Sequence, residues 1–114
     1  MRGNKALAEP KVSAPIFFAL GDETRLRLVS RLCGQGPLSI TRLTEGSKVS
    51  RQAITKHLRV MEDAGLVRSR QEGRERVWAL EQQRLADARR HLRTISAEWE
   101  VRSDARSASL NADR

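Results

Sequence analysis

The sequence predicts a mainly α-helical domain with one small β-hairpin, on three observations. Apolar residues recur every three or four positions over most of the chain, which is the spacing of helices with one buried face. Residues that start or stop helices bracket these periodic segments. Between residues 66 and 80 the apolar period drops toward two around Gly73, which is typical of a hairpin. A chain of 114 residues has the usual length of one domain.

The charge balance narrows the kind of partner. The chain carries 22 Lys and Arg against 14 Asp and Glu, a formal charge of +8, which favours a polyanion such as nucleic acid or an anionic membrane. The membrane is the weaker alternative, because no apolar run approaches the roughly 20 residues that span a bilayer and the N-terminus has no apolar leader segment. One cysteine cannot form an internal disulfide, so we expect a cytoplasmic protein.

Two helices are predicted early in the chain, after a flexible arm over residues 1–13. The apolar segment 15–20 forms a turn or short helix with Pro15 at its first position. Asp22 caps the next helix, which covers about 23–33. The residues of this helix expected to face inward are Leu26, Val29, Leu32 and Cys33, and those expected to face mostly outward are Arg25, Arg27 and Arg31.

Two short helices joined by a glycine-containing turn follow. Ser39 is the expected N-cap of a helix that reaches about Glu45, and Ser50 is the expected N-cap of a helix over 51–64. Such a pair, with the second helix basic on its free face, predicts a helix-turn-helix.

The second of these helices has a predictable end. Gly65 supplies the left-handed residue that stops it, and Leu66 can fold back onto Met61 as the apolar contact of a Schellman motif.

The two faces of segment 51–64 differ in chemistry. The inward face is apolar and consists of Ala53, Ile54, His57, Leu58 and Met61. The outward face has cations and amides but no acid, as an element lying against phosphates and base edges requires, and it consists of Arg51, Gln52, Thr55, Lys56 and Arg59. Alone, this pattern also fits a solvated amphipathic helix, so the motif context decides.

A DNA-binding role gives each outward residue an expected contact. We expect Ser50 to meet the DNA backbone, and Arg51, Gln52 and Thr55 to contact base edges, since Arg pairs with guanine and Gln with adenine. Lys56 and Arg59 are expected phosphate contacts.

A β-hairpin with glycine at its tip is predicted next. Strands over 66–70 and 74–80 flank the turn 71–73. Neither strand has a clean apolar face near the tip, so the hairpin should project into solvent as a wing suited to a phosphate backbone or a narrow minor groove. The wing residues expected to bind DNA are Arg68, Arg70, Gly73 and Arg74, and Arg76 lies on the same hairpin.

The helical period returns at Glu81 with a regular apolar seam. Its members step by three, four, three and four, as in a coiled coil; they are Leu85, Ala88, Leu92, Ile95 and Trp99. The seam could pack on its own domain, but we favour pairing with a second copy, since a domain this short has little interior left to cover it. The expected dimer contacts are Phe17, Leu85, Leu92, Ile95 and Trp99. Residues 101–114 should form a flexible tail.

This element order is that of a winged-helix protein. The strings DETRLRL at 22–28, PLSITRL at 37–43, SRQAITKHL at 50–58, AGLV at 64–67 and EGR at 72–74 together resemble the ArsR-type transcriptional repressors. The resemblance covers about residues 14–100, expected to form one winged-helix DNA-binding and dimerisation domain. It implies a homodimer that represses promoters through double-stranded DNA and usually releases it when an effector binds. A two-fold protein implies a pseudo-palindromic operator.

The sequence departs from the metal-sensing members of that family. Where they carry a cysteine pair, this chain has Ser39 and Thr41, which are poor ligands for soft metals. Along the terminal helix only Asp87, His91 and Glu98 are available, and two ligands one turn apart are commonplace. We therefore expect a branch without a metal site and without a cofactor; a repressor gated by metal or thiol oxidation is the alternative.

The remaining chemically active residues suggest no catalysis. A redox role for Cys33 competes with that of a small buried hydrophobe, which is more common. His57 is expected to pack or cap within the core, and Trp78 and Trp99 to anchor the core and the interface. We expect no enzyme, because two histidines and one cysteine lie far apart without a phosphate loop. A scaffold that contacts an acidic protein partner is the alternative from another class.

Overall fold

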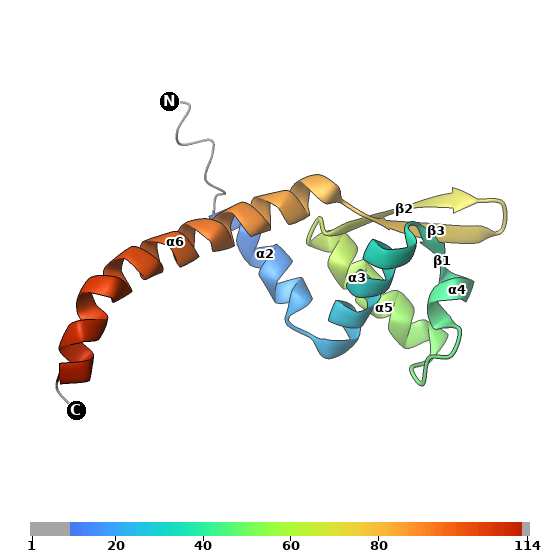
Figure 1. Ribbon diagram of the computed structural model, residues 1–114. Coiled ribbons are helices and arrows are strands. Elements are labelled where there is room, and N and C mark those ends of the chain that lie inside the picture. The colour runs from blue at the N-terminus through green and yellow to red at the C-terminus, as the bar shows by residue number, and fades with distance from the viewer. Residues whose placement is uncertain (1–9, 113–114) are drawn as a thin grey trace, which may run out of the picture.

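The structure is a computed structural model that describes residues 10–112, with side chains described up to Asp104. Its helices are α2 (Pro10–Leu20), α3 (Glu23–Gln35), α4 (Ile40–Thr44), α5 (Arg51–Asp63) and α6 (Gln82–Ala112). Its strands are β1 (Leu38–Ser39), β2 (Val67–Glu72) and β3 (Glu75–Leu80). Figure 1 shows α2 to α5 packed together, the hairpin projecting on one side and α6 running away on the other. The predicted winged helix-turn-helix fold is confirmed.

No helix in the described part of the chain is both long and apolar enough to cross a membrane.

Three helices begin at the predicted capping residues. In each case a side-chain oxygen accepts from the backbone N–H three residues later, which satisfies one of the free donors of the first turn. These bonds join Asp22 Oδ2 to Arg25 N at 3.0 Å, Ser39 Oγ to Arg42 N at 3.2 Å and Ser50 Oγ to Ala53 N at 3.1 Å. The cap at Ser50 fixes where α5 begins, and the buried Ile54, Leu58 and Met61 set its inward face.

The predicted Schellman motif ends α5. Gly65 has φ +83°, the backbone N–H of Leu66 donates to Met61 O at 2.9 Å, and that of Gly65 donates to Glu62 O at 2.9 Å. Leu66 and Met61 are both fully buried. The motif therefore turns the chain from α5 directly into β2.

Gly65→Ala is expected to lower the free energy of unfolding by about 1–2 kcal/mol, because L residues are disfavoured in the left-handed region. A Cβ there would also lie 3.3 Å from Arg84 Nε. Urea denaturation followed by circular dichroism measures the loss. Gly34→Ala is the control, since a Cβ at this helical glycine meets nothing within 4 Å; equal effects of the two changes would contradict the argument.

The sheet has one strand more than predicted. Its order is β1-β3-β2, all antiparallel, with Leu38 opposite Trp78 and Glu72 opposite Glu75. β1 has only two residues, too few to show a period. The hairpin itself is confirmed, but its turn is Gly73–Arg74, so Arg74 lies in the turn and not in the second strand as predicted.

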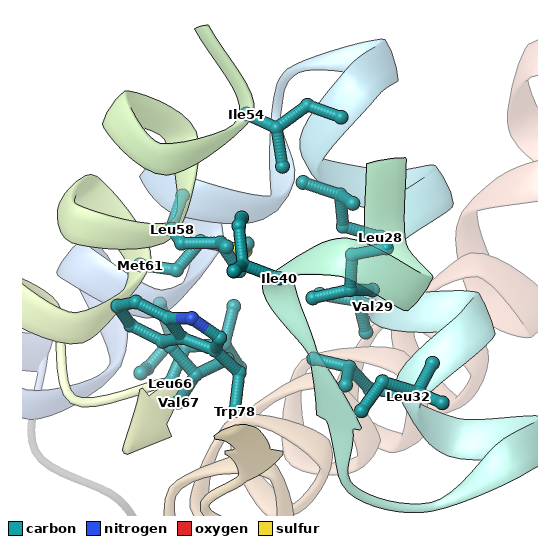
Figure 2. Packing of buried hydrophobic residues seen from close by; sticks show 14 of the residues in the cluster. Leu28, Val29, Leu32, Ile40, Ile54, Leu58, Met61, Leu66, Val67 and Trp78 are labelled. Atoms are coloured by element: carbon teal, nitrogen blue, oxygen red, sulfur yellow. The ribbon is translucent and has the colours of Figure 1, made fainter. Parts of the chain in front are cut away.

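The core gathers around Trp78, which is 1% exposed. Figure 2 shows its indole among Met61, Leu66 and Val67, with Leu28 and Leu32 of α3 completing the cluster. Trp78 is thus the predicted core anchor, and it links the hairpin to the helix-turn-helix.

The first described helix differs from its predicted start. α2 begins at Pro10, and Pro15 lies inside it, so the prediction that Pro15 opens the helix is wrong. The missing N–H of Pro15 would have bonded to Lys11 in the first turn, where little helix precedes it. Residues 10–13, predicted to belong to the arm, are helical, and Ser13 is buried. The predicted arm otherwise lies outside the described residues.

Helix α3 is rotated relative to its predicted face. Leu28, Val29 and Leu32 are buried, whereas Leu26 is 50% exposed and Cys33 is exposed. The predictions that Leu26 and Cys33 face inward are therefore wrong. The apolar residues of α3 form two sets that both have helical spacing. The set that contacts α5 and the sheet is the buried one.

Helix α6 is longer than predicted, and its apolar seam has a buried part and an exposed part. It continues to Ala112, so the boundary predicted at residue 101 is wrong for the backbone; residues 102–112 contain no glycine or proline to stop a helix. Within the seam, Leu85 and Ala88 pack on the chain's own core. Leu92 is 50%, Ile95 53% and Trp99 68% exposed.

Candidate nucleic-acid interface

The outward surface of α5 presents the predicted polar residues together. Ser50, Arg51, Gln52 and Lys56 are exposed, and Thr55 is half-buried beside them. No ion pair or side-chain hydrogen bond within the described residues occupies Arg51, Gln52 or Lys56. Their donors are thus available to an outside partner.

Thr55 lies at the edge of this surface. Its Oγ1 donates to Arg51 O at 2.9 Å, which leaves the hydroxyl oxygen able to accept a further hydrogen bond. The residue can therefore contribute to recognition only from one side.

Arg59 is held differently from Lys56. Its Nη1 lies 3.3 Å from Glu62 Oε1, and its guanidinium carbon lies 5.7 Å from the centroid of the Trp78 ring. The other carboxylate oxygen of Glu62 accepts from Ser69 Oγ at 3.0 Å. The i+3 spacing of Glu62 from Arg59 is visible in the sequence, but its bond to Ser69 of β2 is not. Glu62 joins α5 to β2 and fixes the hairpin relative to α5.

The wing residues divide between the tip and the base of the hairpin. Arg74 lies in the exposed turn beside Gly73, whose φ is +61°. Arg70 is exposed and its Nε donates to Glu72 Oε2 at 2.6 Å. Arg68 lies at the base, where its Nη1 is 3.1 Å from Glu81 Oε1. Figure 1 shows the hairpin tip on the same side of the domain as the first turn of α5.

The inner edge of α5 is tied to the start of α3. Arg25 Nε donates to Ala19 O at 2.7 Å, and its Nη1 lies 3.2 Å from His57 Nδ1. His57 is also 3.8 Å from Asp22 Oδ2. The Arg25 backbone N–H, helped by the Arg25 and His57 charges, lowers the pKa of the Asp22 carboxyl. His57 thus has the predicted packing position, whereas Arg25, expected mostly outward, holds two helices together.

Helix α4 is fastened on both sides by residues that the sequence patterns did not reveal. Arg31 donates to Leu43 O and Arg42 O, each at 3.1 Å. Thr41 Oγ1 donates to the Glu75 carboxylate at 2.9 Å. Because these partners are distant in sequence, no local spacing could have indicated them.

Three of the five residues considered at metal-ligand positions, Ser39, Thr41 and Asp87, have other partners. Thr41 is bonded to Glu75, and Ser39 caps α4. Asp87 forms an ion pair with Arg90 at 2.7 Å. Over the described residues, no three His, Cys, Asp or Glu side chains are grouped as a metal site would require.

The expected dimer contacts form two sets. Phe17 and Leu85 are partly buried against the chain's own core, and the Phe17 ring meets the His91 ring edge-on with centroids 6.5 Å apart. Leu92, Ile95 and Trp99 stay exposed along α6. Phe18, next to Phe17 in α2, is 70% exposed.

Comparisons with known proteins agree with this geometry. Residues 20–70 match a family model described as a helix-turn-helix domain. The chain is 44% identical over 68 residues to the uncharacterized HTH-type transcriptional regulator YuzN of Bacillus subtilis, covering 54% of this chain and 74% of that one. It is 42% identical over 74 residues to the HTH-type transcriptional regulator Rv2034 of Mycobacterium tuberculosis, covering 65% and 68%.

A solved structure extends the likeness beyond this segment. An ArsR-like transcriptional regulator from Rhodococcus sp. RHA1 is 39% identical, with a TM-score of 0.70, over 83% of this chain and 89% of that one.

Proposed function

The chain belongs to the ArsR family of transcriptional regulators and carries its helix-turn-helix DNA-binding domain, and from this premise we propose that it is a homodimeric repressor of a pseudo-palindromic operator. The outer surface of the first turns of α5 carries the proposal, because its exposed side chains, Arg51, Gln52 and Lys56, include no acid. This surface opens at a capped N-terminus, where free backbone donors and the helix dipole favour a phosphate.

Base recognition falls to the first turns of α5. Arg51 and Gln52 are exposed and have no partner in the described chain, so they can form the bidentate pairs with guanine and adenine that a major groove offers. Thr55, whose hydroxyl hydrogen is donated to Arg51 O, supplies a further acceptor at the edge. Lys56 meets phosphate as a point charge.

Backbone contacts flank this surface on the hairpin side. Contacts with Glu62 and Trp78 hold the Arg59 side chain in one orientation. Less side-chain entropy is therefore lost when Arg59 binds a phosphate. Arg70, Gly73 and Arg74 near the tip fit the adjacent groove. Arg68 lies at the other end of the hairpin, beside Glu81.

The exposed part of the α6 seam supports the homodimer. Leu92, Ile95 and Trp99 expose half or more of their side chains, a contiguous apolar stripe of the kind that marks an interface. Phe17 and Leu85, partly buried against the chain's own core, lie next to it. A two-fold pair would present two α5 helices to half-sites about one helical turn apart.

The proposal is tested with Gln52→Ala and Lys56→Ala. We expect Gln52→Ala to reduce the discrimination between bases at particular positions by about 1–3 kcal/mol. Lys56→Ala should lower the affinity for all DNA sequences alike and should reduce the slope of log affinity against log salt concentration by about one. The operator is first obtained by selecting bound fragments from a random pool. Affinities for the operator and for scrambled DNA are then titrated at several salt concentrations.

The exposed residue Glu45 supplies the control, since Glu45→Gln changes charge outside this surface. Sequence-blind effects of both test variants would refute the recognition assignment. Loss of DNA binding by neither variant would favour a scaffold role instead.

A further inference from the structure

A groove runs between the end of α3, the base of the hairpin and the first turns of α6. It has a volume of about 530 Å³, and Leu32, Pro37, Leu80, Leu85, Ala86 and Arg89 are among its lining residues. A hollow of about 300 Å³ continues along the hairpin and shares Pro37, Arg68 and Ala79 with it. The volume of this α3–α6 groove lies in the range of small-molecule sites.

The groove combines an apolar floor with a cationic rim. Pro37, Ala79 and Leu85 contribute apolar surface, while Arg68 and Arg89 stand at the edge. No Asp or Glu lines the groove or the adjoining hollow. Arg89 is exposed and forms no ion pair within the part of the chain that the structure describes. Its charge therefore lacks compensation beside an apolar surface.

We propose that the α3–α6 groove binds a small amphipathic anion, an apolar chain or ring that carries a carboxylate. The apolar part would cover the floor and release water from it. The carboxylate would pair with the planar guanidinium groups of Arg89 and Arg68, which match its two oxygens.

The position of the groove gives this ligand a regulatory effect. Arg68 of β2 pairs with Glu81, which connects β3 to α6. A bound carboxylate competes with Glu81 for Arg68 and so loosens the link between the hairpin and α6. Figure 1 shows the start of α6 well away from the first turn of α5, so the ligand does not compete for the recognition surface. This consequence rests on the proposed function, whereas the binding itself does not.

Decanoate tests the binding on the full chain without DNA. Decanol and decyltrimethylammonium are matched probes that keep the apolar chain but lack the negative charge. Calorimetric titration should give decanoate an affinity at least about tenfold higher than either, because a charge-assisted hydrogen bond is worth at least that factor. Equal affinities would overturn the proposal, as would the absence of decanoate binding.

The single cysteine reports on the location. Cys33 lines the groove and is exposed, so saturating decanoate should slow its alkylation by iodoacetamide several-fold, and decanol at the same concentration should not. Unchanged alkylation with bound decanoate would place the ligand elsewhere and overturn the assignment.

Variants test whether Arg89 and Ala86 contribute to decanoate binding. Arg89→Gln should weaken decanoate about tenfold, while Arg93→Gln, an exposed arginine of α6 outside the groove, should not. Ala86→Trp should fill the groove and abolish binding with an unchanged circular dichroism spectrum and an unchanged mass by light scattering. Equal losses in the two arginine variants, or a mass change in Ala86→Trp that makes the groove a subunit contact, would overturn the proposal.

DNA titrations with and without decanoate separate the two proposals. Operator affinity should fall several-fold in the wild type and stay constant in Arg89→Gln. Decanoate binding by a chain that reads no operator would refute the proposed function alone. Operator binding by a chain that does not bind decanoate would refute the groove proposal alone.

Discussion

Trp78→Ala is expected to lower the free energy of unfolding by about 3–5 kcal/mol, the cost of deleting a large buried aromatic side chain. Trp78 is 1% exposed and packs among residues of α5 and the sheet. Its removal leaves a void that neighbours from separate elements cannot close together, and it removes the ring beneath Arg59. A loss of that size is a large fraction of the stability of a small domain.

Urea denaturation at fixed protomer concentration measures this loss, because the stability of an oligomer depends on concentration. Circular dichroism is the appropriate signal, because the substitution removes an indole and so changes the tryptophan fluorescence itself. Trp78→Phe is the matched variant, and it should cost less because an aromatic ring remains. A loss below 1 kcal/mol for Trp78→Ala would show that the hairpin is not anchored through this residue.

The helix ends could be predicted because their chemistry is local. Ser50 caps α5 through a bond that spans three residues, and Gly65 stops it through bonds that span five at most. Once both ends were fixed, the outward residues of α5 followed from the helical period. For this reason the fold and the outer surface of α5 could be predicted from the sequence.

Features that depend on distant contacts could not be predicted. Leu26 and Leu28 both lie on stripes with helical spacing, and only packing against α5 and the sheet decides between them. β1 exists because Leu38 pairs with Trp78, forty residues later. In the candidate site, the pairing of Arg68 with Glu81 separates that arginine from the hairpin tip, although its place in the sequence resembles that of Arg70.

Ile95→Glu is expected to convert the proposed homodimer to monomers. Ile95 is 53% exposed in the single chain and lies between Leu92, which is 50% exposed, and Trp99, which is 68% exposed. In a two-fold pairing its side chain would be covered by the same seam of the second copy, and a carboxylate there would be buried without a partner. Static light scattering should therefore give the monomer mass.

Loss of the dimer should also reduce operator affinity by about 100-fold or more, because linked half-site contacts gain that factor from effective concentration. Affinity for a single half-site should not change, since α5 is remote from Ile95. Ala97→Glu is the control: it adds the same charge two residues away, on the opposite side of α6 from the seam. A dimer mass for Ile95→Glu would mean that this seam does not join the subunits, and equal disruption by Ala97→Glu would attribute the effect to added charge.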